Sequence, residues 1–252
     1  MAGHSKFKNI QHRKGAQDKK RAKIFSRCAK EIIVATKEGG ADADMNPRLR
    51  LAIQNAKSQN MPNDNIARAI KTGSGEGQDA ASFEEMRYEG YGPNAIAVIV
   101  EALTDNRNRT AGEVRAVFTK RGGNMGETNS VSFMFDRLGE IIFPASVASA
   151  DDMFEAAVEA GAENVESDDD EHVIYTAPDD FMAVLNALQE KLGDAKQAEL
   201  TFKANIEKEL NEEEAQQILD MIEAFEDIDD VQSVYTNMSV SDEVMAKLEA
   251  AE

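Results

Sequence analysis

The stretch EHVIYTAPDDFMAVLNALQEKLGDAKQAELTFK, residues 171–203, decides the fold class of this 252-residue chain. It carries a helical pattern of apolar residues over 179–192, between two runs, 172–176 and 197–203, that predict strands. The segment immediately before it repeats the order strand, helix, strand. Residues 139–203 therefore predict strand, helix, strand, strand, helix, strand, the order of a ferredoxin-like antiparallel sheet with two helices on one face.

Strand and helix patterns continue on both sides of this ferredoxin-like unit. The predicted strands are 83–90, 95–103, 131–136, 139–143, 163–167, 172–176, 197–203 and 231–236. The predicted helices in the same part are 109–121, 151–161, 179–192 and 211–226. We expect the strands before and after the unit to pair with each other, which makes the unit an insertion into a second α+β domain.

The first 80 residues predict a small three-helix domain. DKKRAKIFSRCAKEIIVATKEGG (18–40) has helical spacing and ends at two glycines, a common C-terminal signal. Asn46 and Pro47 suit the cap and first residue of a second helix, and a third begins near Pro62. KTGSGEGQDAAS (71–82) has the composition of a linker.

We therefore predict a multidomain α+β protein, because 252 residues are enough for two or three domains. In chain order, its parts are a basic three-helix domain (1–80), a middle α+β domain (81–137 and 204–240), an inserted acidic ferredoxin-like domain (138–203) and a C-terminal tail helix (241–252).

Charge is distributed very unevenly along the chain. The formal net charge is -19, yet residues 1–80 carry sixteen lysines and arginines against eight acids. Residues 151–252 carry five against thirty. A basic end and an acidic end on one chain indicate a polyanion-binding module joined to a part that does not adhere to polyanions.

The basic residues of the first helix form a stripe along one side of it. At 100° per residue they gather there with acids only at the edges, whereas an ordinary solvated helix face mixes both signs. Cations in a line suit the phosphates of nucleic acid, so we favour that interpretation over a solvated face. The arm before this helix, the second helix and the segment TDNRNRT (104–110) add further cations. The predicted nucleic-acid-binding residues are Lys6, Lys8, Arg13, Lys14, Lys19, Lys20, Lys23, Arg27, Lys30, Arg48, Arg50, Arg107 and Arg109.

Two interpretations are open for TDNRNRT. A capping box at Thr110 explains the end of the segment but not the two arginines. Cations at the start of a helix are unfavourable unless they hold an anion. Arg107 and Arg109 therefore either contact a phosphate or carboxylate of the target, or form an internal ion pair with Glu85 or Glu89.

Two other segments have simple structural interpretations. RYEGYGPN (87–94) predicts a turn between two strands, in which Tyr88 and Tyr91 would be stacking candidates if they are exposed. ESDDDEH (166–172) predicts a solvated hairpin loop, and it is a poor metal site because adjacent carboxylates point apart along an extended chain.

Motifs of catalysis and of cofactor binding are missing. The sequence has no P-loop, dinucleotide fingerprint, zinc spacing or nucleophile elbow. Its single cysteine, Cys28, falls on an apolar helix face, where a buried inert thiol is expected. The longest apolar run, 95–103, is too short to cross a bilayer, and no secretory signal is apparent. We expect a cytoplasmic, non-enzymatic protein without a metal, cofactor or membrane partner, and keep an unrecognised enzyme as a distant alternative.

Four stretches together resemble the YebC family, and the likeness covers nearly the whole chain. They are AGHSKFKNIQHRKGAQDKKRAKIF (2–25), NPRLRLAIQNAKSQNMPNDNIARAIKTGSGE (46–76), YEGYGPNAIAVIVEALTDNRNRTAGEVRAVFTKRGGNMG (88–126) and VSFMFDRLGEI (131–141). One departure is Phe7, which stands where the family usually has tryptophan.

The resemblance implies a helical N-terminal domain followed by two α+β domains, the last inserted into the middle one. It also implies a role in gene expression. Members are described as DNA-binding transcriptional regulators, mitochondrial relatives as translational activators, and a ribosome-associated role is attributed to the family in bacteria. Because the helical domain lacks a clear helix-turn-helix signature, we favour RNA (rRNA or tRNA) or the ribosome as partner and keep DNA-binding transcriptional regulation as the alternative.

Overall fold

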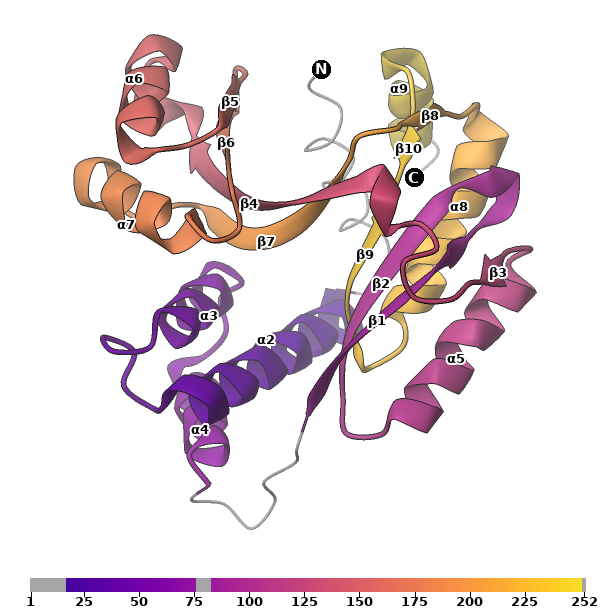
Figure 1. Cartoon of the computed structure of the whole chain (residues 1–252), viewed down its shortest axis with the longest axis horizontal. Helices are drawn as coiled ribbons and strands as arrows, with labels where there is room; N and C mark the ends of the chain where they lie inside the picture. Colours follow the sequence, from indigo (N-terminus) through magenta and orange to yellow (C-terminus); the bar gives the residue numbers. More distant parts are fainter. Residues whose placement is uncertain (1–16, 76–82, 251–252) are drawn as a thin grey trace.

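The computed structural model describes residues 17–75 and 83–250 of the chain, with side chains from Arg21 to Leu248 in these ranges (Figure 1). Three assemblies of secondary structure are visible: helices near the N-terminus, a sheet covered by two helices, and a second sheet covered by two more. The multidomain α+β class predicted from the sequence is confirmed. The domain boundaries given above stay predictions.

The N-terminal helices pack around a small apolar core of their own. Apolar residues follow the helical period in each helix and so form one inner side. Ile32, Leu49, Ala56 and Ile66 are buried there. The three helices are α2 (Gln17–Gly39), α3 (Pro47–Ser58) and α4 (Asn63–Gly73).

Asn46 begins α3, as predicted. Its side-chain oxygen accepts a hydrogen bond from the amide of Leu49 at 3.1 Å, the usual N-cap contact. Its side-chain amide donates to the carbonyls of Ala35 at 2.7 Å and Gly40 at 2.8 Å. The cap therefore also joins α3 to the end of α2.

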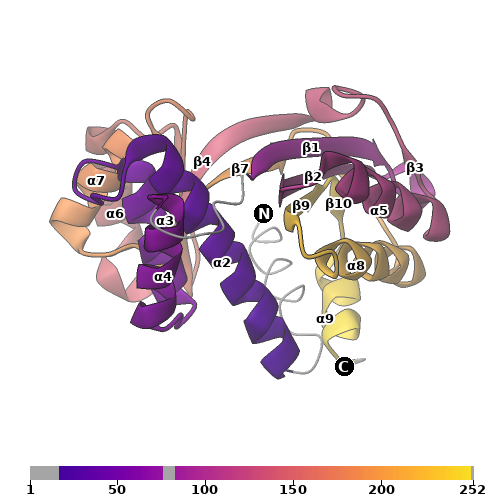
Figure 2. The same cartoon turned by 90° about the horizontal axis from the view of Figure 1, so that it is seen from below.

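A four-stranded sheet with strand order β3-β1-β2-β9 forms the middle of the molecule. Both helices, α5 and α8, cover one face of it (Figure 2). On that face Phe118 and Phe225 meet edge to face, with ring centroids 4.9 Å apart. Strands β2 and β9 pair although they flank the second sheet in the sequence, which confirms the predicted pairing. The elements are β1 (Glu84–Tyr91), β2 (Ala97–Thr104), α5 (Arg107–Lys120), β3 (Asn124–Met125), α8 (Glu212–Glu226) and β9 (Val231–Thr236).

The second sheet has strand order β5-β6-β4-β7, with β4 pairing antiparallel to both β6 and β7. This is the strand order that the ferredoxin-like pattern predicts, and helices α6 and α7 bury Phe143, Met153 and Leu188 against one face. The elements are β4 (Phe135–Pro144), α6 (Ala150–Ala160), β5 (Asn164–Ser167), β6 (Glu171–Thr176), α7 (Phe181–Leu192) and β7 (Gln197–Ala204).

One predicted strand, 131–136, is wrong. Residues 132–134 form a short 3-10 turn, η2 (Ser132–Met134), and the strand that follows is a single long β4. The cause is Glu89, whose fully buried side chain accepts from the amides of Val131 at 3.0 Å and Ser132 at 2.9 Å. A carboxylate that takes these amides leaves them unable to pair in a sheet.

Small elements close the structure. Lys208 and Glu209 pair in parallel with Met238 and Ser239, and a small core formed around Ile99, Phe202 and Tyr235 lies between the two sheets. The remaining elements are η1 (Pro93–Ala95), η3 (Ala145–Val147), β8 (Lys208–Glu209), β10 (Met238–Ser239) and α9 (Asp242–Ala250).

Helix α3 lies against the second sheet. Leu51 packs on the core under α6 and α7, Gln54 donates to the carbonyl of Ala195 at 3.3 Å, and Asn55 donates to that of Ala198 at 2.9 Å. The N-terminal helices are thus held to the second sheet near β7 by apolar packing and neutral amide contacts. Their second contact, with the middle sheet, involves charged groups.

Candidate nucleic-acid interface

The basic side of α2 faces the connection between α8 and β9. Lys23, Arg27 and Lys30 lie at i, i+4 and i+7 and so on one side of the helix. Lys23 forms an ion pair with Asp227, and Arg27 donates from Nη2 to the carbonyl of Glu226 at 3.0 Å. This part of the predicted nucleic-acid stripe contacts protein.

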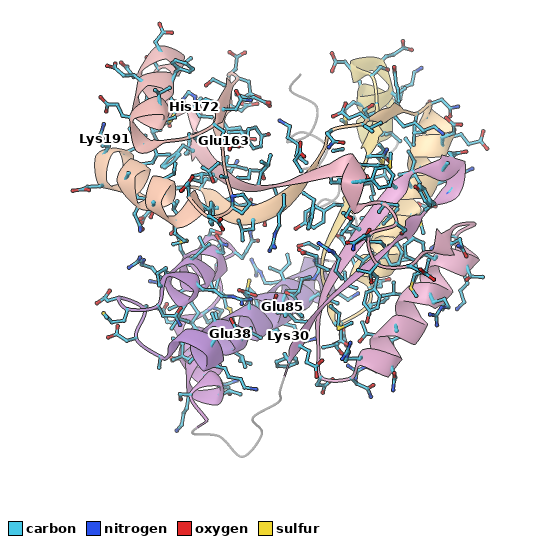
Figure 3. The ribbon with its side chains drawn as sticks, viewed as in Figure 1. Lys30, Glu38, Glu85, Glu163, His172 and Lys191 are labelled. Atoms are coloured by element: carbon cyan, nitrogen blue, oxygen red, sulfur yellow. The ribbon has the colours of Figure 1, made fainter. Side chains whose placement is uncertain are left out.

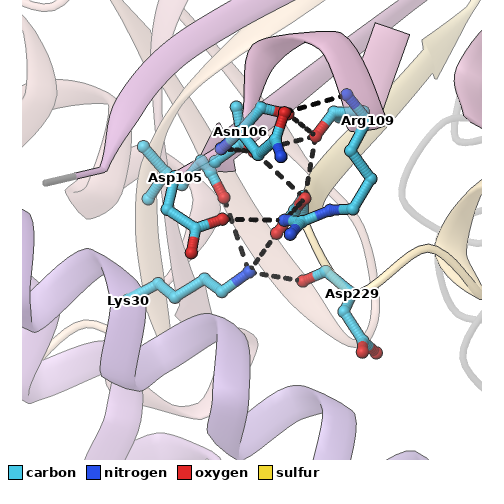
Figure 4. Close-up of polar contacts among 9 residues, drawn as sticks. Lys30, Asp105, Asn106, Arg109 and Asp229 are labelled. Carbon is cyan, nitrogen blue, oxygen red and sulfur yellow. Dashed lines mark hydrogen bonds and ion pairs between the residues drawn. The ribbon is translucent and has the colours of Figure 1, made fainter. Parts of the chain in front are cut away.

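Lys30 is largely enclosed, with only 13% of its side chain exposed, at the boundary between α2 and the middle sheet (Figure 3). Its Nζ donates to Asp230 Oδ1 at 2.7 Å and to the carbonyl of Asp229 at 2.8 Å (Figure 4). A third, longer contact of 3.4 Å reaches the carbonyl of Leu103, and the ammonium lies 5.4 Å from the ring centre of Phe83. The three ammonium hydrogens thus have three acceptors inside the protein.

Asp230 joins α2 to α5 through its two oxygens. While Oδ1 binds Lys30, Oδ2 accepts from Arg109 Nη2 at 2.5 Å, Thr110 Oγ1 at 2.8 Å and Thr104 Oγ1 at 3.1 Å. Burial alone would raise the pKa of this carboxyl, but hydrogen bonds from Arg109, Lys30 and Thr110 outweigh it and hold the pKa well below its usual range. Asp230 is therefore a charged, fully bonded joint between two helices.

The start of α5 differs from the prediction. The helix begins at Arg107, and its cap is Asn106, whose Oδ1 accepts from the amide of Arg109 at 3.1 Å. The capping box at Thr110 is wrong: Thr110 lies fully buried in the first turn, and its hydroxyl bonds Asp230 and the Thr104 hydroxyl.

The two arginines of this segment have different surroundings. Arg109 forms internal ion pairs with Asp105 at 2.8 Å and with Asp230, so its internal partners are these aspartates and not Glu85 or Glu89. Arg107 reaches Glu84 only at 3.6 Å, and 64% of its side chain is exposed. A role of either arginine at nucleic acid stays a prediction.

Arg48 is also held by protein carboxylates. Its guanidinium contacts Glu31 at 2.8 Å, Glu38 at 2.7 Å and Glu85 at 2.6 Å, the last from strand β1. Arg50 is half-buried, and its Nη1 lies 3.5 Å from the carbonyl of Asp44.

Models of known protein families match most of this chain. A model of the TACO1/YebC protein N-terminal domain matches residues 5–76, and a model of the TACO1/YebC second and third domains matches residues 83–238. This chain belongs to the TACO1/YebC family. Its structure is similar to the crystal structure of a conserved hypothetical protein from Aquifex aeolicus, with 47% sequence identity and a TM-score of 0.81 over 92% of this chain and 96% of that one.

The second TACO1/YebC model carries a transcriptional-regulator designation, so the family is regulator-like.

Several predicted contact residues of this family member lie beyond what the structure describes. Lys19 and Lys20 belong to the first turn of α2, without described side chains. The arm residues Lys6, Lys8, Arg13 and Lys14 lie outside the described residues.

The structure also brings out cations that the sequence analysis did not assign to a site. Arg68 and Lys71 on α4, and Arg115, Lys120 and Arg121 in and just after α5, are all exposed. Within the described ranges, their side chains make no hydrogen bond or ion pair. Helical spacing could have identified Arg68, Lys71, Arg115 and Lys120, because they lie outside the apolar stripe of their helices.

Three other groups considered from the sequence are accounted for by packing. Burial raises the pKa of the Cys28 thiol, as expected for an inert cysteine on an inner helix face. His172 lies in strand β6, not in an acidic loop, and its buried ring nitrogens lie 2.7 Å from Ser167 Oγ and 3.1 Å from the carbonyl of Ala148. Tyr88 is buried and so cannot stack on a base, whereas Tyr91 is 37% exposed.

Among residues 17–75 and 83–250, no three histidine, cysteine or acidic side chains gather as metal ligands. In the same ranges, no helix has the length and apolar character needed to cross a bilayer.

Proposed function

We propose that this protein is a non-enzymatic regulator of gene expression that binds RNA and acts on translation at the ribosome, in the cytoplasm. The observation that carries the proposal is the separation of charge: sixteen bases against eight acids over residues 1–80, and five against thirty over residues 151–252. Phosphate binding by lysine and arginine is the main source of affinity for nucleic acid, and a basic module provides it.

The surroundings of α2 argue against base reading by this helix and favour contacts of the protein with the phosphate backbone of nucleic acid. A helix that reads DNA bases presents one side chain face to the major groove. Here Lys23, Arg27 and Lys30 face the middle sheet, and Lys30 has no hydrogen left for another acceptor. The cations that stay exposed on α4 and α5 suit phosphates, which carry no sequence information.

A salt titration tests the proposal on the full chain. Binding to a fragment of ribosomal RNA, to tRNA and to duplex DNA is measured by fluorescence anisotropy at several salt concentrations. We expect binding to RNA with a steep negative slope of log K against log salt. Absence of binding to all three probes would refute a nucleic-acid function, and a clear preference for duplex DNA would favour transcriptional regulation, which the designation of the family model supports.

The arm before α2 gives a sharper version of this test. Replacing Lys6, Lys8, Arg13 and Lys14 by glutamine should reduce the slope by about 3, since each phosphate contact contributes about 0.7–0.9. Substitution is preferable to deletion of residues 1–30, because Phe25, Cys28 and Ala29 of α2 pack in the N-terminal core. An unchanged slope would show that these four cations do not contact phosphates.

A further inference from the structure

The outer face of α5 is the second concentration of positive charge in the molecule. Five of the seven lysines and arginines between residues 81 and 150 lie in 107–121, where Glu113 is the single acid. Arg109 is engaged with Asp105 and Asp230, which fixes the start of the helix. Of the other four cations, Arg115 and Lys120 lie on the outer side of the helix by its 100° spacing, Arg107 lies on the side of Glu84 in β1, and Arg121 follows the last helical residue.

These cations are available to a partner. Arg115, Lys120 and Arg121 are exposed and, in the part of the chain that the structure describes, have no hydrogen-bonded or ionic partner for their side chains. Arg107 has one long contact of 3.6 Å to Glu84. An ordinary solvated helix face carries both signs. Of the two helices that cover the middle sheet, α8 carries many acids and α5 carries five cations, counting Arg121 at its C-cap, against one acid.

A glycine in the middle of the same face has no explanation inside the protein. Gly112 is exposed in the second turn of α5, and a Cβ built there meets nothing within 4 Å. By contrast, a Cβ on Gly90 or Gly123 would come within 2.5 Å and 2.4 Å of backbone oxygens, so the fold itself requires those two glycines. Glycine inside a helix lowers its stability relative to alanine, and at Gly112 the fold gains nothing in return.

The neighbours of Gly112 on the helix surface are Asn108 and Arg109 on the preceding turn and Arg115 and Ala116 on the following turn. The face therefore has a low area, formed by Gly112 and the small side chain of Ala116, next to the polar side chains of Asn108 and Arg115. Buried Val114 and Phe118 hold the opposite side of the helix on the middle sheet. A rigid helix with a low, basic outer surface suits close approach of a charged polymer backbone.

We propose that α5 binds the phosphodiester backbone of nucleic acid along its outer face: Arg115 and Lys120 contact phosphates on either side of Gly112, which admits the backbone to the helix surface, and Arg107 and Arg121 contact phosphates at the two ends of the helix. This inference rests on the proposed function and adds a second contact region to it, separate from the N-terminal arm. RNA and DNA share the phosphate chemistry, and the binding assay includes both.

The first test separates stability from binding at one position. Gly112→Ala and Gly112→Leu both replace glycine by a better helix former in open space, so both should raise the melting temperature. Affinity for RNA should be nearly unchanged in Gly112→Ala and weakened about tenfold in Gly112→Leu, whose side chain covers the face; a tenfold change corresponds to about 1.4 kcal/mol. Equal affinity of wild type and Gly112→Leu would overturn the role of Gly112.

The second test removes charge. Arg115→Gln with Arg121→Gln should reduce the slope of log K against log salt by about 1.5, because two phosphate contacts are lost. The matched control is Lys191→Gln with Lys247→Gln, which removes the same charge from α7 and α9, where each lysine pairs with a glutamate (Figure 3 shows Lys191). The control should leave the slope nearly unchanged.

The outcomes distinguish the two proposals. A wild-type protein that binds neither RNA nor DNA contradicts both the proposed function and the α5 face. A wild type that binds while the Arg115/Arg121 variant keeps the slope of the control contradicts the α5 face alone. A loss of slope confined to the Arg115/Arg121 variant supports the α5 face, with the RNA and DNA probes showing which polymer it prefers.

Discussion

Helices α2 and α5 both carry a basic face, but the protein uses the two faces differently. On α2, Lys23, Arg27 and Lys30 are engaged by the α8–β9 connection. On α5, only Arg109 is engaged in a comparable way, while Arg115 and the cations at the helix end stay exposed. A run of cations in a sequence therefore does not show whether the charges hold the protein together or await a partner; that depends on acids far away in the chain.

The largest expected effect is a loss of stability at Asp230, which joins α2 to α5 through Lys30 and Arg109. Asp230→Ala leaves the charges of Lys30 and Arg109 without their main partner, and breaking a buried pair costs about 3–5 kcal/mol of unfolding free energy. Asp229→Ala is the matched control, because only the backbone of Asp229 binds Lys30; it should change stability by less than about 0.5 kcal/mol. Denaturant unfolding measures the unfolding free energy of both variants. Similar values for the two would contradict the stabilising role of Asp230.

The two arginines of α5 sharpen the same comparison. Arg109→Gln removes charged hydrogen bonds to Asp105 and Asp230 and should destabilise the protein by about 1.5–3 kcal/mol. Arg107→Gln should change stability by less than about 0.5 kcal/mol, since its side chain is mostly exposed, while weakening RNA binding. The reverse order of stabilities would show that the helix start is anchored differently.

Lowering the pH should weaken the contacts of Asp230 with Lys30 and Arg109, because protonation removes the charge of the carboxylate. The folded-state pKa of Asp230 is depressed below the unfolded value of about 3.9, so its contribution is present above that pH and is lost as pH falls towards the folded pKa. Below about pH 4, the stability difference between wild type and Asp230→Asn should shrink by up to about 1.4 kcal/mol per pH unit. Unfolding curves at pH 7, 4 and 3 measure it, and a constant difference would be the contrary result.

The smallest effect concerns the exposed α5 face. Gly112→Ala should stabilise the protein by about 0.5–1 kcal/mol, because the helix interior loses a glycine and the new methyl group meets no neighbour. Thermal unfolding checks this. A loss of stability would mean that the fold itself requires glycine at position 112. The glycine would then no longer support nucleic-acid binding by this face.

Local patterns predicted most of the fold. The cap at Asn46 and the ferredoxin-like strand order follow from residues within a turn or an element of each other, where spacing and side-chain type suffice. The pairing of β2 with β9 was also predicted, since the strands around an insertion have few other partners.

Long-range contacts account for the errors. Lys30 and Asp230 are 200 residues apart in the sequence, so helical spacing alone could place Lys30 on a basic stripe but not show what covers it. Likewise Glu89 takes the amides of Val131 and Ser132 from 42 and 43 residues away and so prevents a strand there. Thr110 looked like a cap because its bond to Asp230 was not visible in the local pattern.

The covered face of α2 has a consequence for work with fragments. Residues 1–80 contain a core of their own, but separated from the rest they would lose Asp227 and Asp230, the acids that engage Lys23 and Lys30. We expect such a fragment to bind RNA more tightly than the intact chain does, with a steeper salt slope, because extra cations meet the phosphates. Titrating the fragment and the whole protein side by side would reveal the difference, and equal slopes would contradict it. An affinity measured on the fragment alone would then describe a surface that the intact protein does not expose.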